Sequence, residues 1–175
     1  MGRHNIPLVK TLFWFVGFSL LLGLSRIIPH PPNFTPLLSV AVFLPQIVKR
    51  TEYTVALTLL AMFIGDLYWG LHPFMIWTYT SIVLCSLLAS KYKNLFLNSI
   101  LASCIFFIVT NFGVWAGGYY GYTFLGLVTC YIAAIPFFTN TLIGTLFYSL
   151  IFYLVHKVIT KYDNKMLRQK SLSKI

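Results

Sequence analysis

Long apolar runs separated by short polar or charged breaks extend over most of the chain. The runs lie at residues 8–28, 34–48, 53–70, 73–90, 95–116, 122–138 and 139–159. A helix that crosses the ~30 Å hydrocarbon core of a bilayer needs about 17–25 predominantly apolar residues. The run at 34–48 is short and contains Pro36 and Pro45, which indicates a tilted or broken helix. The other runs are long enough, so the pattern predicts an all-α integral membrane protein.

The composition supports lipid as the medium around the chain. Of 175 residues, 58% are hydrophobic and 9% are charged. A soluble domain carries about 25% charged residues, because its surface faces water. The only acids are Glu52, Asp66 and Asp163. A soluble fold of this size would have too few polar side chains to cover it.

The cations lie at the ends of alternate apolar runs. Cytoplasmic ends of membrane segments are enriched in lysine and arginine, so we expect both termini to be cytoplasmic in a bacterial inner membrane. Charges placed in this way do not form a groove for phosphates, which argues against nucleic acid as a partner. These cations are Arg3 and Lys10 before the first run, Lys49 and Arg50 after the second, Lys91 and Lys93 after the fourth, and Lys157, Lys161, Lys165, Arg168, Lys170 and Lys174 near the C-terminus.

The number of runs conflicts with this orientation if every run crosses the membrane. A crossing at 122–138 would leave the basic tail at 160–175 outside. Backbone that enters a membrane without crossing needs shelter from protein or a cavity. We therefore predict one domain over 1–175, with six spanning helices and an outer re-entrant or interfacial element at 122–138. No small-residue cleavage site follows the first run, which is expected to remain as a helix.

Asp66 is the only acid within a predicted span. An ionisable group in a membrane is costly and marks a functional site by default, and Arg26 is the expected partner of Asp66. The alternative is a structural ion pair at the outer interface. His30 and His72 flank the pair as ligands or pH-sensitive donors, or as ordinary solvated loop residues.

Aromatic side chains gather on the predicted outer side, where Trp69, Trp77 and Trp115 lie. They fit either a site with flat walls or an aromatic belt at the membrane interface. No catalytic motif accompanies them, so an enzyme is poorly supported. Cysteines are present only within apolar runs, at Cys85, Cys104 and Cys130, without the spacing of a disulfide framework or a zinc site.

Several strings in the chain are distinctive. They are RIIPHPPNFTP at 26–36, GDL at 65–67, FFIVTNFGVW at 106–115, and CY at 130–131 followed by IPFFTNTL at 135–142. These strings resemble a family of small bacterial inner-membrane proteins similar to the substrate-binding S-components of energy-coupling-factor transporters. They also resemble the solitary vitamin B12 uptake proteins of the BtuM kind. The resemblance covers about residues 20 to 155.

The resemblance implies six helices, cytoplasmic termini and a cavity open to the periplasm. It also implies a corrinoid such as cobalamin as the transported ligand, with no intrinsic cofactor and with His30 and Asp66 lining the cavity. A cysteine thiolate on cobalt would assist reductive removal of the upper ligand, and this is the enzymatic activity that the resemblance implies. Cys85 is the candidate ligand, but it lies about 18 Å below the outer end of its helix and packing is the alternative. Tyr79 lies at a better depth.

We therefore expect an uptake protein for cobalamin or another corrinoid, embedded in the lipid bilayer. The alternatives are an S-component-like transporter for another small molecule, a non-transporting membrane subunit, and a cobalamin-processing enzyme. The chain has no nucleotide-binding motif, so an energising ATPase, if one is used, would be a separate module. The expected ligand-binding residues are His30, Asp66, Trp69, His72, Tyr79, Cys85, Asn111, Trp115 and Tyr131.

Overall fold

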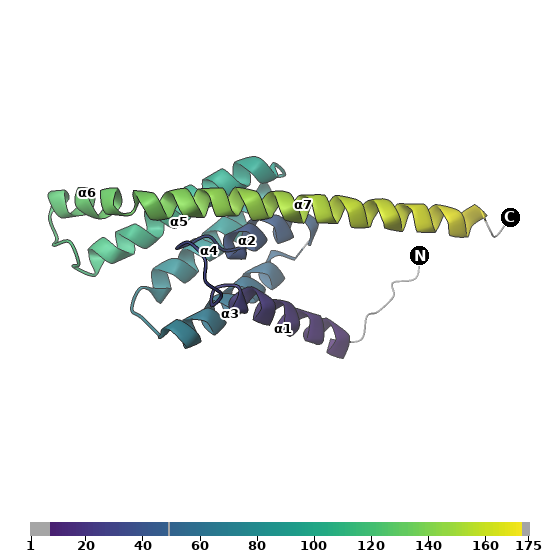
Figure 1. Cartoon of the computed structure of the whole chain (residues 1–175), viewed down its shortest axis with the longest axis horizontal. Coiled ribbons are helices and arrows are strands. Elements are labelled where there is room, and N and C mark those ends of the chain that lie inside the picture. Colours follow the sequence, from purple (N-terminus) through teal and green to yellow (C-terminus); the bar gives the residue numbers. More distant parts are fainter. Residues whose placement is uncertain (1–7, 49, 173–175) are drawn as a thin grey trace.

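The structure is a computed structural model that describes residues 8–48 and 50–172 (Figure 1). Arg3, Lys49 and Lys174, which belong to the predicted charge pattern, lie outside these residues. The described residues form helices only, which confirms the all-α prediction. The seven helices are α1 (Leu8–Leu24), α2 (Leu37–Ile47), α3 (Thr51–Trp69), α4 (Met75–Lys91), α5 (Leu95–Ala116), α6 (Phe124–Ala133) and α7 (Ile135–Leu172).

The last helix differs most from its predicted range. It begins at Ile135 rather than 139 and ends at Leu172 rather than 159, so the basic tail continues the helix. The predicted element at 122–138 corresponds to α6 and the first turn of α7, which are separated by a single break at Ala134 (Figure 1). The helix Leu95–Ala116 has the bounds that the sequence predicts. Its start is fixed by Asn94, whose side chain accepts a hydrogen bond from the Leu97 amide at 3.0 Å.

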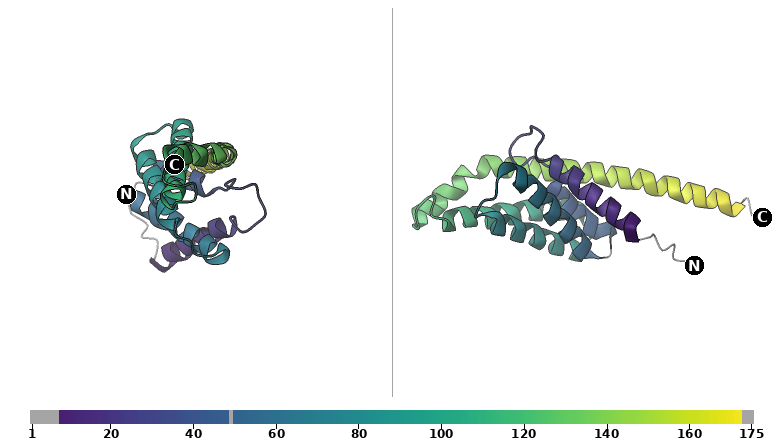
Figure 2. Two further views of the ribbon diagram at one scale, coloured as in Figure 1. Left: turned by 90° about the vertical axis from the view of Figure 1, so that its left-hand side faces the viewer. Right: turned by 90° about the horizontal axis from the view of Figure 1, so that it is seen from below.

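The helices form a bundle with two distinct ends. The start of α4 lies beside the end of α5, where the rings of Trp77 and Phe112 are 5.4 Å apart. Near the other end, Lys93 and His156 line one groove together with residues from the end of α2. The helix α1 begins and α7 ends on the same side of the bundle, beyond which α7 extends (Figures 1 and 2). Lys91 at the end of α4, Lys93 in the turn before α5 and the cations of α7 therefore share one end.

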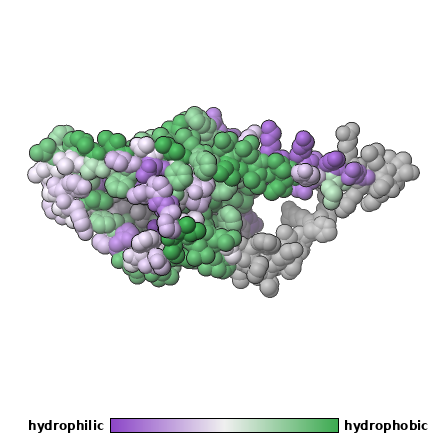
Figure 3. Space-filling model, in the orientation of Figure 1, coloured by the Kyte–Doolittle hydropathy of each residue, from purple (hydrophilic) through white to green (hydrophobic). Residues whose placement is uncertain are grey.

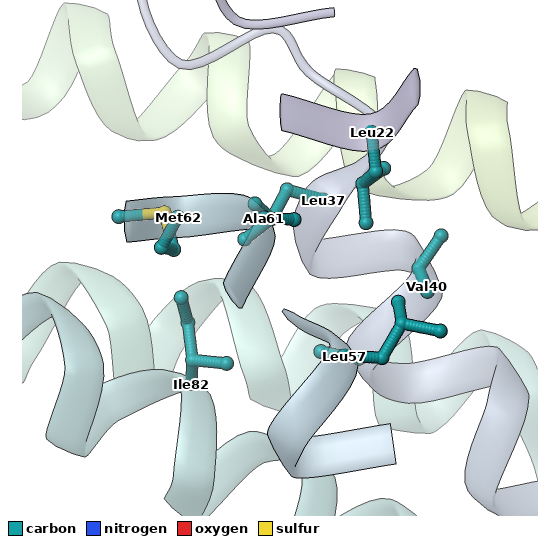
Figure 4. Close-up of a cluster of buried hydrophobic side chains, with 8 residues drawn as sticks. Leu22, Leu37, Val40, Leu57, Ala61, Met62 and Ile82 are labelled. Atoms are coloured by element: carbon teal, nitrogen blue, oxygen red, sulfur yellow. The ribbon is translucent and has the colours of Figure 1, made fainter. Parts of the chain in front are cut away.

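The short helix α2 is the centre of the packing. Residues 37–43 are all buried, and α2 packs against α3, α4, α5 and α7. Val40 contributes to a cluster that joins α1 to α4, with Leu22, Leu57 and Ile82 from the neighbouring helices (Figure 4). Only 11 residues form α2, a length of about 17 Å at 1.5 Å per residue. Pro36 stands at its N-terminal end, where proline costs no hydrogen bond.

The surface is rich in large apolar side chains, and the interior contains many small polar residues beside its apolar core. Large apolar side chains lie on the surface of every helix, and hydrophobic residues cover α7 where it crosses the bundle (Figure 3). Small polar residues are inside. Helices that associate in lipid pack through such small residues, whereas a soluble monomer rarely exposes a large apolar surface. The buried serines and threonines are Ser19, Ser39, Thr54, Thr58, Ser81, Ser86, Ser99, Ser103, Thr141, Thr145 and Ser149.

Two helical segments among the described residues are long and apolar enough to cross a membrane. They are Leu95–Ala116 and Ile135–Met166, with 22 and 32 residues. Few of their residues are fully buried, since 22% and 17% of their most apolar windows are buried. The apolar parts of α1, α2, α4 and α6 are shorter. Helix length and apolarity therefore support two spanning helices and do not by themselves support the predicted six.

Candidate functional site

The loop between α1 and α2 has a conformation that its prolines and Asn33 determine. The amide of Phe34 donates to the carbonyl of Pro31 at 3.0 Å, which closes a turn. Pro32 and Asn33 are the central residues, and Asn33 has a φ of 64°. A type II turn favours proline at its first central position and requires a positive φ at the second, which asparagine tolerates. The string PPNF at 31–34 thus specifies a turn.

Contacts to two helices hold this loop against the bundle. The ring of Phe34 packs on Phe147 and Tyr148 of α7, at centroid distances of 6.0 and 5.6 Å. Gly144 allows this approach, because a Cβ there would lie 3.2 Å from the Phe34 Cα. On the α3 side, Trp69 Nε1 donates to the Arg26 carbonyl at 3.1 Å. The loop is therefore anchored at both ends.

Beneath the loop, Arg26 and Asp66 form the expected ion pair. Arg26 Nη1 lies 2.8 Å from Asp66 Oδ1 and 2.7 Å from the Met62 carbonyl, to which it also donates. The hydroxyl of Tyr79 donates to the other carboxylate oxygen, Oδ2, at 2.8 Å. The Asp66 side chain is 1% exposed and the Arg26 side chain 20%. Both oxygens of the buried carboxylate are thus satisfied, as a buried charge requires.

This geometry determines what the site presents to a ligand. Asp66 lies behind Arg26 and neutralises it, so the pair carries no net charge. Arg26 remains partly exposed and lines a cavity, and guanidinium groups carry five N–H donors. The site therefore offers hydrogen-bond donors to carbonyl or carboxylate oxygens of a ligand, without the field of an unpaired cation.

A cavity of about 430 Å³ lies under the loop, and helices α2, α3, α5 and α7 form its other walls. A second cavity of about 100 Å³ adjoins it and shares Asn33, Phe106 and Thr141 with it. Ligand pockets for drug-sized molecules measure about 300–1,000 Å³ and combine apolar walls with a few polar groups. The residues of the larger cavity are Arg26, Ile27, Ile28, Pro29, His30, Pro32, Asn33, Thr35, Leu37, Leu38, Met62, Trp69, Phe106 and Thr141.

The structure brings some of the predicted site residues together. His30 and Trp69 line the larger cavity, and Asn111 lines the smaller one. Asp66 and Tyr79 line neither cavity, but they hold Arg26 in place from behind. These five residues thus belong to one region.

Three other predicted site residues lie away from both cavities, in other contacts at the same end of the bundle. The ring of His72 lies 6.2 Å from that of Phe74. Trp115 Nε1 donates to the Thr123 carbonyl at 3.3 Å, and the Tyr131 hydroxyl donates to the Ile108 carbonyl at 2.7 Å. Trp115 and Tyr131 therefore attach the start and end of α6 to α5. They do not line the cavities under the loop.

Cys85 is also separate from the cavities. Its side chain is 0% exposed and packs between α2, α4 and α5, among Leu38, Val42 and Ala102. Its thiol donates to the Ala102 carbonyl at 3.4 Å. Packing, the alternative to a role as cobalt ligand, accounts for the position of Cys85. Across residues 8–48 and 50–172, no group of three or more histidine, cysteine or acidic side chains could hold a metal ion.

The sequence did not identify the helical residues that complete the cavity. Met62, Phe106 and Thr141 come from three different helices, and each looks like an ordinary packing residue in its own segment. Thr35, in the loop, has no unusual chemistry. Phe106 and Thr141 do fall within the distinctive strings at 106–115 and 135–142, which was the only available signal.

The comparisons with known proteins identify a family without a function. A family model described as a family of unknown function, DUF6580, matches residues 8–167. Since the match covers most of the chain, the chain belongs to this family. Searches of curated proteins and of solved structures gave no match.

Proposed function

We propose that this DUF6580 protein is a membrane protein that captures a small molecule from the periplasm and releases it into the cell, similar in plan to an S-component. The observation that carries the proposal is the cavity under the α1–α2 loop. It lies away from the cation-bearing end of the bundle and contains the partly exposed Arg26, which Asp66 holds from behind.

The membrane location has three kinds of support. Large apolar side chains cover the outside, and many small polar residues lie between the packed helices, which suits lipid better than water. The segments Leu95–Ala116 and Ile135–Met166 are long enough to span. The cations gather at one end of the bundle, as the positive-inside rule expects. We place α1 to α5 and α7 across the bilayer, with the short α2 sheltered among α3, α4, α5 and α7, and α6 on the outer side beside α5.

This orientation explains why α7 is long. A helix of 38 residues measures about 57 Å, well beyond the ~30 Å of a hydrocarbon core. The excess is the basic part of α7, which would extend into the cytoplasm together with the C-terminus. The α1–α2 loop and its cavity would then face the periplasm of a bacterial inner membrane.

The size of the cavity limits the size of the ligand that it can hold. A volume of about 430 Å³ suits a molecule of drug size or smaller, with acceptor groups for Arg26 and Asn33. Cobalamin, which the sequence resemblance implies, carries a corrin ring and a nucleotide loop and is larger than this space. Its binding would require the α1–α2 loop to move outward. We therefore propose a smaller nutrient as the ligand, with a corrinoid as the alternative.

The test is a thermal-shift assay on the purified full chain in detergent. The panel contains cyanocobalamin and the smaller water-soluble vitamins, and the variants are wild type and Arg26→Gln. A ligand at 100 times its Kd stabilises a protein by about 2.7 kcal/mol. One compound should raise the Tm of wild type and lose that effect in Arg26→Gln. Cooperative unfolding with no response in either protein would favour a non-transporting membrane subunit instead.

A further inference from the structure

A second large hollow lies near the cation-bearing end, away from the cavity under the loop. It is an open groove of about 870 Å³ between α2, α5 and α7. Phe43, Ile47, Phe96 and Leu150 are among its apolar walls. Polar groups lie at the turn before α5 and further along α7, where Lys93, Asn94 and His156 line it.

Two serines that line the groove are buried, and their hydroxyl groups contact each other. The hydroxyl of Ser99 on α5 lies 3.1 Å from that of Ser149 on α7, within hydrogen-bonding distance. Ser99 also donates to the Leu95 carbonyl of its own helix at 2.9 Å. These hydroxyls hold the two helices together where the groove meets the packed interior. The apolar walls can contact hydrocarbon. The polar side chains that remain for an occupant are those of Gln46, Lys93, Asn94, Tyr153 and His156.

The charge of the groove restricts its occupant. Lys93 lines it, Lys157 follows His156 in the chain, and none of the described lining residues is acidic. Phosphate groups bind to lysine through charge-assisted hydrogen bonds. Basic pockets between membrane helices on the cytoplasmic side bind the head groups of anionic lipids. An amphiphile with one anionic end and an apolar chain matches both parts of the groove.

We propose that this groove is a binding site for an anionic phospholipid of the inner leaflet. Its phosphate lies at Lys93, with His156 beside it, and an acyl chain follows Phe43, Phe96 and Leu150. The site rests on the membrane location proposed above but does not depend on a ligand in the cavity under the loop.

The experiment counts bound lipids by native mass spectrometry of the full chain released from nanodiscs. The nanodiscs contain phosphatidylglycerol and phosphatidylcholine with the same acyl chains, in equal amounts. Both leaflets are present, so the result does not depend on the orientation of the protein. Wild type should retain one phosphatidylglycerol in preference to phosphatidylcholine.

Two matched pairs of variants locate the site. Lys93→Gln should lower phosphatidylglycerol occupancy about fivefold, the factor that corresponds to about 1 kcal/mol per lysine near an anionic lipid. Lys161→Gln, further along the exposed part of α7, should not. Leu150→Trp should fill the groove and displace the lipid, whereas Leu154→Trp, an exposed leucine of α7 outside the groove, should not.

Equal retention of the two lipids by wild type would overturn the proposal, as would equal occupancy in Lys93→Gln and Lys161→Gln. A dimer mass with no bound lipid would assign the groove to a second copy of the chain. These outcomes leave the vitamin panel unaffected, because it reports on Arg26 near the other end of the bundle. A vitamin panel in which no compound raises the Tm would likewise not change the lipid-binding result.

Discussion

The guanidinium of Arg26 lies directly over the backbone of Gly65, so closely that a Cβ at position 65 would overlap with Nη1. Asp66, the next residue along α3, accepts the hydrogen bond from the same nitrogen. The glycine makes room for the arginine and the aspartate holds it there. The dipeptide Gly65-Asp66 is thus one structural unit, and both of its residues determine where Arg26 presents its remaining donors.

Gly65→Ala should therefore displace Arg26 from Asp66. Overpacking at a tight site costs typically about 1–3 kcal/mol, so the Tm should fall and binding in the cavity should be lost. Gly17→Ala in α1 is the matched control, because nothing lies within 4 Å of the added Cβ. The measurement is thermal unfolding in detergent. Equal Tm values for the two variants would show that Arg26 has room to move aside.

The ion pair should show strong coupling in a double-mutant cycle. Asp66→Asn leaves the Arg26 charge without its partner beneath the loop, and removing one member of a buried pair costs about 3–5 kcal/mol. Arg26→Gln leaves the Asp66 carboxylate, which is 1% exposed, without its counter-charge. The double variant removes both charges and should be more stable than the sum of the two single effects predicts. Additive losses in the free energy of unfolding would contradict the pairing.

The anchoring of the α1–α2 loop should depend on Phe34. Its two ring contacts are worth about 0.5–1.5 kcal/mol each, so Phe34→Ala should increase opening of the loop about fivefold or more. Proteinase K cleavage within residues 27–36, mapped by mass spectrometry, measures this opening. Phe124→Ala, at a residue 81% exposed on α6, is the control and should leave the rate unchanged. A loop cut at the same rate in both variants would mean that Phe34 is not an anchor.

The sequence predicted the helices and the ion pair for sound physical reasons. Apolar runs of sufficient length form helices, and one acid within them has few available partners, so the sequence alone predicts the pair of Asp66 and Arg26. The helix starting at Leu95 begins where the apolar run begins, and in the structure Asn94 caps it there. The distinctive string at 26–36 covers most of the α1–α2 loop.

The remaining parts of the site depend on tertiary packing, which a linear pattern does not contain. The position of Cys85 along α4 can be predicted from the sequence, but the burial of its thiol between α2 and α5 depends on how those helices pack. The end of α7 was misplaced because the charged residues after 159 continue the helix without a glycine or proline to end it. Met62 and Thr141 line the cavity only because α3 and α7 meet beneath the loop.

Cys85 should have no part in binding a corrinoid. Because its thiol is buried and faces the Ala102 carbonyl, Cys85→Ser should leave the absorption spectrum of added cyanocobalamin as it is with wild type. N-ethylmaleimide should modify Cys104, which is partly exposed, well before Cys85. A shift of the cobalt spectrum on substitution would restore the thiolate as a ligand.

The central claim is that the α1–α2 loop faces the periplasm while the basic part of α7 lies in the cytoplasm. It is tested most directly in bacterial spheroplasts with single-cysteine variants, in which serine replaces the three native cysteines. Ile28→Cys places a thiol in the loop, at a residue 64% exposed, and Thr160→Cys places one on the exposed part of α7. A membrane-impermeant maleimide should label Ile28→Cys in intact spheroplasts and Thr160→Cys only after lysis. Labelling of Thr160→Cys in intact spheroplasts, with Ile28→Cys protected until lysis, would contradict the account.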